Sequence, residues 1–564
     1  MPNARVLAMQ YKLKSIILAF VFALIPQTQI ISVADSIPDE QFDGLGNGYQ
    51  YGSPGNGYLS MWFTDTDIKP MPPSITAFTP TTGSYFPKKC KSLSDPICLA
   101  EQFLEVSTQY PSCLNSILRN CLSEVWVIDK AGVRHEGVFV RSIKGIETPL
   151  FPEDVNNAVP QSSLPQVVRF PDLHGLETQD FLVTATMKGV RQTSNSFGDA
   201  GKQVDVYFHA VKIVAAEVKL ETGATNWIKF AVDNKQFNSC VAIGDGECAK
   251  PIKLPTGLRY GLTLKTSKNI APWLESRTRN PKVSVEYDSS NFLTKLEGES
   301  VLVPSISGGG EFTSLPLEIR NRYPEADPAK SNSHITWGIS SASQGTTSLN
   351  DLKIWLPFLG EKATVMPSAW SFRSLGVVAS HQLTTSPFRE CAEKSSTNLL
   401  GVVASNATAF SSGPPKFNPE TISLDYEIAA PHLTSNGDVF YGSYSLIMNS
   451  GFARCIYSLT SAPVKATVSV LNTEGQKKIA TETVSESDSW IKLSAEGFSF
   501  SSPLVRVKLI QESKTSDTPD LNRNSENVTS KGSNSKKTIS CVKGKVIKKI
   551  TAVKPKCPFG YKAK

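Results

Sequence analysis

The clearest pattern in the chain is an alternation of apolar and polar residues within the segment 386–512. Residues 422–428 alternate Ile, Leu, Tyr and Ile with polar side chains, and residues 464–470 repeat this period of two. Such a period places the apolar side chains on one face of a strand, which is typical of antiparallel sheets with one buried face. Turn-forming residues at 472–475 follow the second run and separate it from later strands. The pattern therefore predicts two antiparallel sheets packed as a β-sandwich.

Shorter runs of the same kind occur earlier in the chain. Residues 124–127 and 282–287 alternate polar and apolar side chains, so the segments 89–215 and 216–385 are predicted to be β-rich as well. Apolar residues at helical spacing after Cys98 predict one helix in the first of these segments. The predicted fold class is thus mainly β, with several antiparallel β-sandwich-like domains in tandem.

Three segments depart from the strand pattern. Residues 350–359 carry apolar residues at helical spacing and are followed by Gly360, so we expect a short buried helix there despite Pro357. Gly308-Gly309-Gly310 is expected to be a loop. Residues 513–535 contain almost no apolar side chains and therefore predict a flexible linker. The predicted organisation is a signal peptide (1–34), a Gly/Pro-rich leader (35–88), β-rich domains (89–215 and 216–385), a β-sandwich domain (386–512), the linker (513–535) and a basic, disulfide-closed tail hairpin (536–564).

The N-terminal segment has the features of a cleaved export signal. Lys12 and Lys14 precede the apolar run 16–25, Pro26 breaks that run, and the small residues at 32–34 predict cleavage before Asp35. A membrane span needs about 20 apolar residues, twice the length of this run, and no later stretch approaches that length. We therefore expect a protein that is secreted or held at the cell surface, without a transmembrane segment after cleavage.

Cysteine usage fits an oxidising exterior, because the number is even and the Cys-x-x-Cys spacing of zinc or redox sites does not occur. The ten candidates for structural disulfides are Cys90, Cys98, Cys113, Cys121, Cys240, Cys248, Cys391, Cys455, Cys541 and Cys557. Neighbour pairing is simplest, and the Gly-Asp-Gly turn between Cys240 and Cys248 favours that bond. The first four cysteines allow three connectivities. No metal or other cofactor is predicted.

Charge separates the end of the chain from its body. The formal net charge is +7, whereas residues 531–564 alone contain eleven Lys and no Asp or Glu, so the remainder is net acidic. Residues 538–542 and 546–550 are predicted to pair as a hairpin, closed by a Cys541–Cys557 bond. The candidate polyanion-binding residues on it are Lys543, Lys545, Lys548, Lys549, Lys554 and Lys556. We expect binding to an anionic cell-wall polymer or glycan, and no specific nucleic acid.

The tail sequence ISCVKGKVIKKITAVKPKCPFGYK, residues 539–562, resembles a C-terminal module of secreted and cell-envelope proteins of aquatic actinobacteria. Residues 430–432, 453–455 and 498–503 are similar to β-rich exported proteins of the same group. The resemblance implies a cell-envelope or extracellular setting. Because the module has no established activity, no functional residues are carried over from it.

The sequence contains no short catalytic motif, since the His-Glu-x-x-His, Gly-x-Ser-x-Gly and phosphate-loop patterns do not occur in it. No catalytic, cofactor-binding or metal-binding residue is therefore nominated. The favoured function is a structural, adhesive or ligand-binding role outside the cytoplasm. The alternative is a secreted hydrolase, directed at carbohydrate, whose two carboxylates leave no motif. A surface-layer subunit is a further hypothesis, and the oligomeric state stays open.

Overall fold

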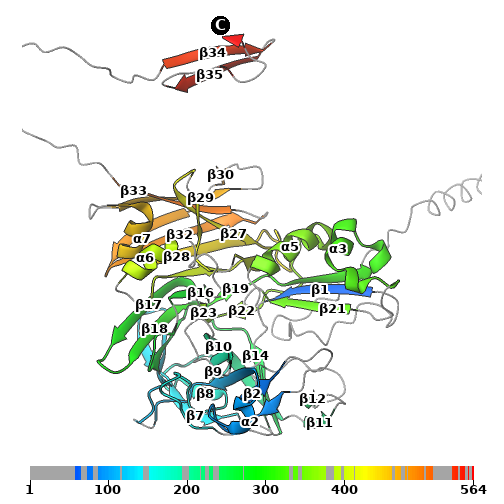
Figure 1. The fold of residues 1–564 in the computed structure, drawn as a ribbon, viewed down its shortest axis with the longest axis vertical. Helices are drawn as coiled ribbons and strands as arrows, with labels where there is room; N and C mark the ends of the chain where they lie inside the picture. Colours follow the sequence, from blue (N-terminus) through cyan, green and yellow to red (C-terminus); the bar gives the residue numbers. More distant parts are fainter. Residues whose placement is uncertain are drawn as a thin grey trace, which may run out of the picture. The chain divides into compact units, whose positions relative to one another are not determined.

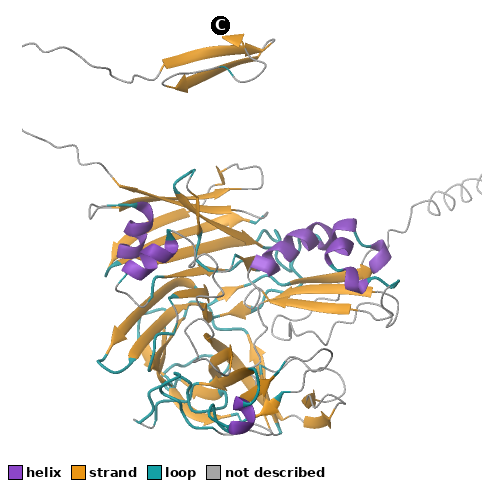
Figure 2. Ribbon diagram, viewed as in Figure 1, coloured by secondary structure: helices purple, strands orange, loops and turns teal. Residues whose placement is uncertain are grey.

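The computed structural model divides the chain into two compact units, Met1–Glu512 and Ser513–Lys564. The residues that it describes are 58–64, 73–79, 87–114, 117–143, 151–192, 202–215, 218–222, 228–232, 241–244, 246–270, 272–329, 335–340, 346–375, 387–395, 399–411, 413–418, 420–459, 464–471, 477–478, 481–500, 504–511, 537–543, 546–552, 557 and 562–563. The described part is mainly β and contains several antiparallel sheets, as predicted (Figure 2).

The largest sheet of the first unit has fifteen described strands and runs from the N-terminal to the C-terminal part of that unit. In spatial order its main path is β3 (Lys88–Lys89), β2 (Ser74–Phe78), β4 (Phe103–Gln109), β9 (Phe181–Gln192), β10 (Lys202–Ala215), β23 (Ser371–Leu375), β16 (Trp273–Arg277), β24 (Gly401–Ser405), β28 (Tyr441–Asn449), β32 (Trp490–Ser499) and β31 (Thr481–Ser487). Beside this path lie β7 (Val138–Ser142), β8 (Gln166–Arg169), β13 (Ala242–Gly244) and β14 (Glu247–Ile252). The sheet crosses the domain borders that we predicted after residues 215 and 385.

A second sheet covers part of this large sheet. Its order is β17 (Arg279–Tyr287), β18 (Phe292–Glu299), β15 (Arg259–Thr266), β5 (Cys121–Ile128) and β6 (Arg134–Glu136). Its inner face carries Val125, Val127, Leu262 and Leu296, which join the core cluster of the large sheet. Val283 and Val285 pack against the same cluster, so the alternation predicted at 124–127 and over most of 282–287 is confirmed, although Tyr287 is exposed. This alternation determines which side chains of the sheet face outward.

The C-terminal strands of the first unit form a third sheet, which packs on the other end of the large sheet. It consists of β25 (Ala409–Phe410), β27 (Ser423–Ala429), β33 (Leu504–Gln511), β29 (Val464–Leu471) and β30 (Lys477–Lys478), with β26 (Lys416–Asn418) beside β27. Tyr426 of β27 and Tyr444 of β28 pack with ring centroids 5.6 Å apart in the core between the sheets. The strands predicted within 422–428 and 464–470 are present, but one of the two packed sheets continues into the rest of the unit.

Residues 58–64, which we had placed in a leader, form the central strand of a further sheet (Figure 1). This strand, β1 (Tyr58–Thr64), pairs with β20 (Ile306–Glu311) and in parallel with β21 (Ile335–Ser340). Its side chains Leu59, Met61 and Phe63 are buried. The glycines 308–310 lie in β20, so the loop prediction is wrong there. A Cβ atom on Gly308 would come within 2.5 Å of Leu359, and one on Gly310 within 3.3 Å of Leu315, so side chains pack closely over both positions.

Helices cover this small sheet and close the C-terminal core. Over the small sheet lie α3 (Leu317–Arg322) and α5 (Thr346–Leu359) with the 3-10 turns η2 (Phe312–Ser314) and η3 (Pro324–Ala326), and the C-terminal core is closed by α6 (Phe388–Lys394) and α7 (Ser450–Tyr457). The short helix α2 (Pro96–Leu99) lies beside β2 and β3. The remaining described strands form the pairs β11 (Val218–Thr222) with β12 (Ile228–Val232) and β19 (Val301–Leu302) with β22 (Ser368–Ala369).

Helix α5 confirms one helix prediction, while α2 corrects the other. Gly360 takes φ +86° and donates its N–H to the Leu356 carbonyl, which ends α5 in the way that glycine permits. Trp355 of α5 is fully buried, as expected for a buried helix. The helix predicted after Cys98 ends after one turn, and strand β4 follows, because its residues pair with β2 and β9.

Three disulfides have both halves among the described residues. Cys90–Cys98 and Cys113–Cys121 pair neighbours, with Cα atoms 5.9 and 5.1 Å apart, so the open connectivity is resolved in favour of the simplest pairing. Cys391–Cys455 is also present, and it joins helix α6 to helix α7. Cys248 is disulfide-bonded too, while its expected partner, Cys240, lies outside the described residues. Several disulfides suggest an oxidising, extracellular type of environment.

None of the described helices is long and apolar enough to cross a bilayer.

His209 on β10 is expected to make the first unit less stable in mild acid. Its Nε2 atom is shielded from water and has no hydrogen-bond partner among the described residues, and this burial lowers the pKa of the imidazole from 6.5 to about 4. Between pH 6.5 and 4 the unfolded chain binds a proton that the folded chain rejects, so stability is lost as the pH falls through that range. Because the side chain is only half-buried, we expect a loss of about 2 kcal/mol.

Chemical unfolding of the wild type and of His209→Gln at pH 7 and pH 4.5 measures this effect. The difference between the two proteins is informative, since buried carboxylates give both a common acid sensitivity. The variant should lose less stability on acidification. Equal losses would show that His209 does not titrate in this range.

Candidate functional site

The candidate site is a cleft of about 710 Å³ on the first unit, where the outer face of the five-stranded sheet meets the β31–β32 hairpin. Trp126 and Arg134 line one end, and Asp488, Ser489 and Trp490 line the other. Between them lie residues of β17 and β18. The remaining lining residues are Lys282, Val283, Ser284, Val285, Lys295, Glu297, Leu399, Asn449 and Lys492. The cleft thus combines two indoles with charged and hydroxyl-bearing side chains.

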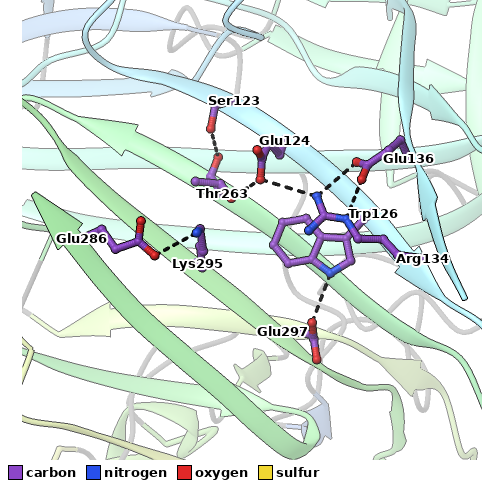
Figure 3. Close-up of polar contacts among 9 residues, drawn as sticks. All are labelled: Ser123, Glu124, Trp126, Arg134, Glu136, Thr263, Glu286, Lys295 and Glu297. Atoms are coloured by element: carbon purple, nitrogen blue, oxygen red, sulfur yellow. Dashed lines mark hydrogen bonds and ion pairs between the residues drawn. The ribbon is translucent and has the colours of Figure 1, made fainter. Parts of the chain in front are cut away.

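Trp126 lies on the outer face of the sheet because a glycine leaves room for its ring. Gly261 on β15 is directly opposite Trp126 in register, and a Cβ atom on Gly261 would come within 2.3 Å of the indole. The ring extends over β15 and its Nε1–H donates to Glu297 Oε2 on β18 at 3.2 Å (Figure 3). A single side chain therefore connects β5 to β18 across the intervening strand.

Arg134 covers the other side of the indole, with its guanidinium carbon 4.2 Å from the ring centroid. The guanidinium is bound to Glu136 at 2.5 Å and approaches Glu124 at 3.5 Å (Figure 3). The hydrogen bond with Glu136 raises the pKa of Arg134, while partial burial opposes that rise. Trp126 is consequently buried beneath the Arg134 guanidinium, which the two carboxylates fix in place. The indole therefore supports the floor of the cleft, and its face is not available to stack on a ligand.

Glu297 is the most enclosed carboxylate of the cleft. Burial alone would raise its pKa, but hydrogen bonds from Arg259 and Trp126 and the charges of Arg259 and Lys282 outweigh burial and lower the pKa below the ordinary value. The Arg259 Nε and Lys282 Nζ atoms lie 3.0 and 3.3 Å from Glu297 Oε1. The carboxylate is therefore ionised at neutral pH and serves as a hydrogen-bond acceptor.

The β31–β32 hairpin forms the opposite wall through a tight turn. Ser487 and Trp490 pair across it, and both residues of the turn, Asp488 and Ser489, have positive φ (51° and 65°). Such values are strained for residues other than glycine. The Ser489 carbonyl accepts the Ser450 N–H at the start of α7 at 2.8 Å, which holds the turn in place. Trp490 is half-buried against the core cluster and borders the cleft.

The lysines that the sequence nominated belong to the second unit, which forms a three-stranded sheet of its own. Its strands are β34 (Lys537–Lys543), β35 (Val546–Ala552) and β36 (Lys562–Ala563) (Figure 1). Lys543 pairs with Val546, Lys548 with Cys541 and Lys549 with Ser540. Lys545, Lys554 and Lys556 lie outside the described residues, as does the Cys541 side chain, so the Cys541–Cys557 bond stays a prediction.

The cleft residues were not nominated from the sequence, because they come from parts of the chain that lie far apart. The segments 126–134, 282–297 and 488–492 contribute most of them, Leu399 and Asn449 contribute the rest, and none of these segments contains a recognisable motif. The outward polar positions of 282–287 were the one available signal, since alternation predicts which residues share a face. Within the described part, no three or more His, Cys, Asp or Glu side chains gather in a group that would hold a metal ion.

No protein-family model matches the chain, and comparisons with curated proteins and with solved structures gave no match either.

Proposed function

We propose that the chain is an exported binding protein of the cell exterior, whose first unit presents a ligand cleft and whose basic second unit holds it noncovalently to an anionic polymer. The observation that carries this proposal is the separation of charge by unit. The eleven lysines of 531–564 fall in the compact unit Ser513–Lys564, while the cleft and the disulfides with both halves described belong to Met1–Glu512. Retention and ligand binding can therefore act independently.

The chemistry of lysine determines what kind of retention is expected. Its ammonium group is a compact, strongly hydrated point charge, so many lysines together attract a polyanion without selecting its detailed geometry. Such attraction is screened by salt, since the Debye length falls from about 8 Å at physiological ionic strength to about 3 Å at 1 M. Binding to an anionic wall polymer or acidic glycan should be broad and salt-sensitive.

The state of the cleft carboxylate supports binding over hydrolysis. A glycosidase needs one carboxylic acid that keeps its proton at the working pH, which requires a raised pKa. Glu297 has the opposite shift and is held by Arg259, Lys282 and Trp126. A carboxylate fixed in this way orders the cleft and accepts hydrogen bonds, but it does not deliver a proton to a leaving group.

Cell fractionation with charge variants tests the retention. In one variant the six lysines 543, 545, 548, 549, 554 and 556 become Gln, and in the matched control they become Arg, which keeps the charge. We expect to find the Gln variant in the medium, and the Arg variant and the wild type on the cells. About 1 M salt should release the Arg variant and the wild type from the cells. Retention of the Gln variant, unchanged by salt, would reject the second unit as an anchor.

A further inference from the structure

Strand β17 has an edge with which no described strand pairs. It is the terminal strand of its sheet and pairs with β18 alone. Four consecutive residues of β17, Lys282 to Val285, line the cleft. Since successive side chains of a strand point to opposite faces, four consecutive lining residues mean that the backbone edge itself borders the cleft. Unpaired N–H and C=O groups at such an edge are able to pair with another extended chain.

The hairpin turn shows which backbone groups are free. Asp288 N–H donates to the Asn291 carbonyl at 3.0 Å, next to the opposed residues Tyr287 and Phe292. In an antiparallel ladder, hydrogen-bonded and non-bonded pairs alternate, so Ser284 bonds to Lys295 of β18. The N–H and C=O groups of Val283 and Val285 then point away from β18, toward the cleft.

The side chains on the two walls of the cleft indicate which kind of added strand would fit between them. On one side, the Val283 and Val285 side chains pack with Trp490 against the core cluster, which offers apolar contacts to alternate residues of a ligand. On the other side, the lining contains Arg134, Lys282 and Lys295, which are paired with Glu136, Glu297 and Glu286. Lys492, on the opposite wall, has no carboxylate partner among the described residues and is the cation that an acidic ligand residue would meet. An extended chain that alternates apolar and acidic residues complements both sides.

We propose that the free edge of β17 binds an extended segment of a partner protein, with alternating apolar and acidic residues, as an added strand. This inference goes beyond the proposed retention, because it concerns the first unit and names the partner chemistry. The space favours a single segment over a second copy of the whole sheet: the β31–β32 turn faces β17 across a cleft of about 710 Å³. Backbone bonds to Val283 and Val285 supply affinity, and the alternating side chains supply selectivity.

Calorimetric titration of the full chain with defined peptides tests the proposal. The probe is acetyl-Thr-Val-Glu-Val-Glu-Val-Thr-amide, and two further versions carry backbone N-methyl groups on either its Val or its Glu residues. In an added strand only every second N–H bonds to the protein, so one methylated version should bind about tenfold or more weakly and the other within about twofold of the parent. Equal binding by both methylated versions, or no binding of the parent, would overturn strand addition.

Protein variants separate the edge from the general charge of the cleft. Val285→Pro removes an outward N–H at an edge position where proline is tolerated. It should weaken binding of the parent peptide by about tenfold, whereas Val285→Ala should weaken that binding less. A further peptide carries Lys in place of both Glu residues. The wild type should prefer the Glu peptide, and Lys492→Glu, on the opposite wall, should prefer the Lys peptide. Self-association that the peptide does not compete with, or binding of a soluble glycan at the same edge, would contradict the proposal. The retention experiment is unaffected by either outcome.

Discussion

Replacing Asp205 by alanine is expected to destabilise the first unit by about 3–5 kcal/mol, the cost of leaving a buried charge without its partner. Asp205 on β10 is fully buried and lies directly opposite Arg373 on β23, whose Nε–H donates to it at 2.9 Å. The amide of Gln203 donates to the same carboxylate at 2.7 Å. Burial would lower the pKa of Arg373, but Asp205 and Glu275 keep the guanidinium charged. Alanine at position 205 would therefore remove the hydrogen-bonded partner of Arg373 and leave Glu275 as its neighbouring anion in the middle of the large sheet.

Urea unfolding followed by tryptophan fluorescence measures this loss. The matched control is the double variant Asp205→Asn with Arg373→Met, which removes both charges and keeps an acceptor for Gln203. It should unfold at a higher urea concentration than Asp205→Ala, although Glu275 then loses a neighbouring positive charge. If Asp205→Ala unfolded at the same urea concentration as the wild type, the pair would contribute nothing to the stability of the large sheet.

Removing the Cys391–Cys455 disulfide should cost about 4 kcal/mol, as the loop-entropy relation gives for a separation of 64 residues. The bond joins α6 to α7, and the rings of Phe388 and Phe452 pack nearby with centroids 5.7 Å apart. A double Cys→Ala variant avoids a free thiol. Differential scanning calorimetry in the absence of reductant should show a lower melting temperature for this variant.

Replacing Cys90 and Cys98 by alanine provides a comparison for that result. That bond closes only eight residues, so the same relation predicts a smaller loss of stability. A larger loss from the short loop than from the long one would show that restriction of the unfolded chain is not the main effect of these bonds.

Local patterns predicted the elements well wherever one period governs a whole segment. The alternating residues 422–428 and 464–470 form strands, and Gly360 ends the helix that the spacing indicated. Neighbour pairing of the first four cysteines was the simplest of three possible connectivities, and it is the one observed. These features depend on residues within a few positions of each other, which is the range over which a period can be read.

Pairing between distant segments determines the rest, and no local pattern encodes it. Residues 58–64 form a buried strand only because β20 and β21, more than 240 residues later, lie on either side of it. The glycines of β20 signal a loop by composition, yet Gly308 and Gly310 lie where side chains of α5 and its neighbours approach the sheet closely. The sequence did not reveal the cleft for the same reason, since one wall comes from β17 and the other from the β31–β32 hairpin, which lie far apart in the chain.

The central claim is that the chain works in an oxidising exterior, where its cysteines are cross-links. The most direct test is intact-mass spectrometry of the protein isolated from its producing cells, with free thiols trapped before any reduction. The account predicts a mature chain that begins at Asp35, occurs outside the cytoplasm and carries no trapped thiols. A chain with residues 1–34 still attached and ten trapped thiols would contradict it.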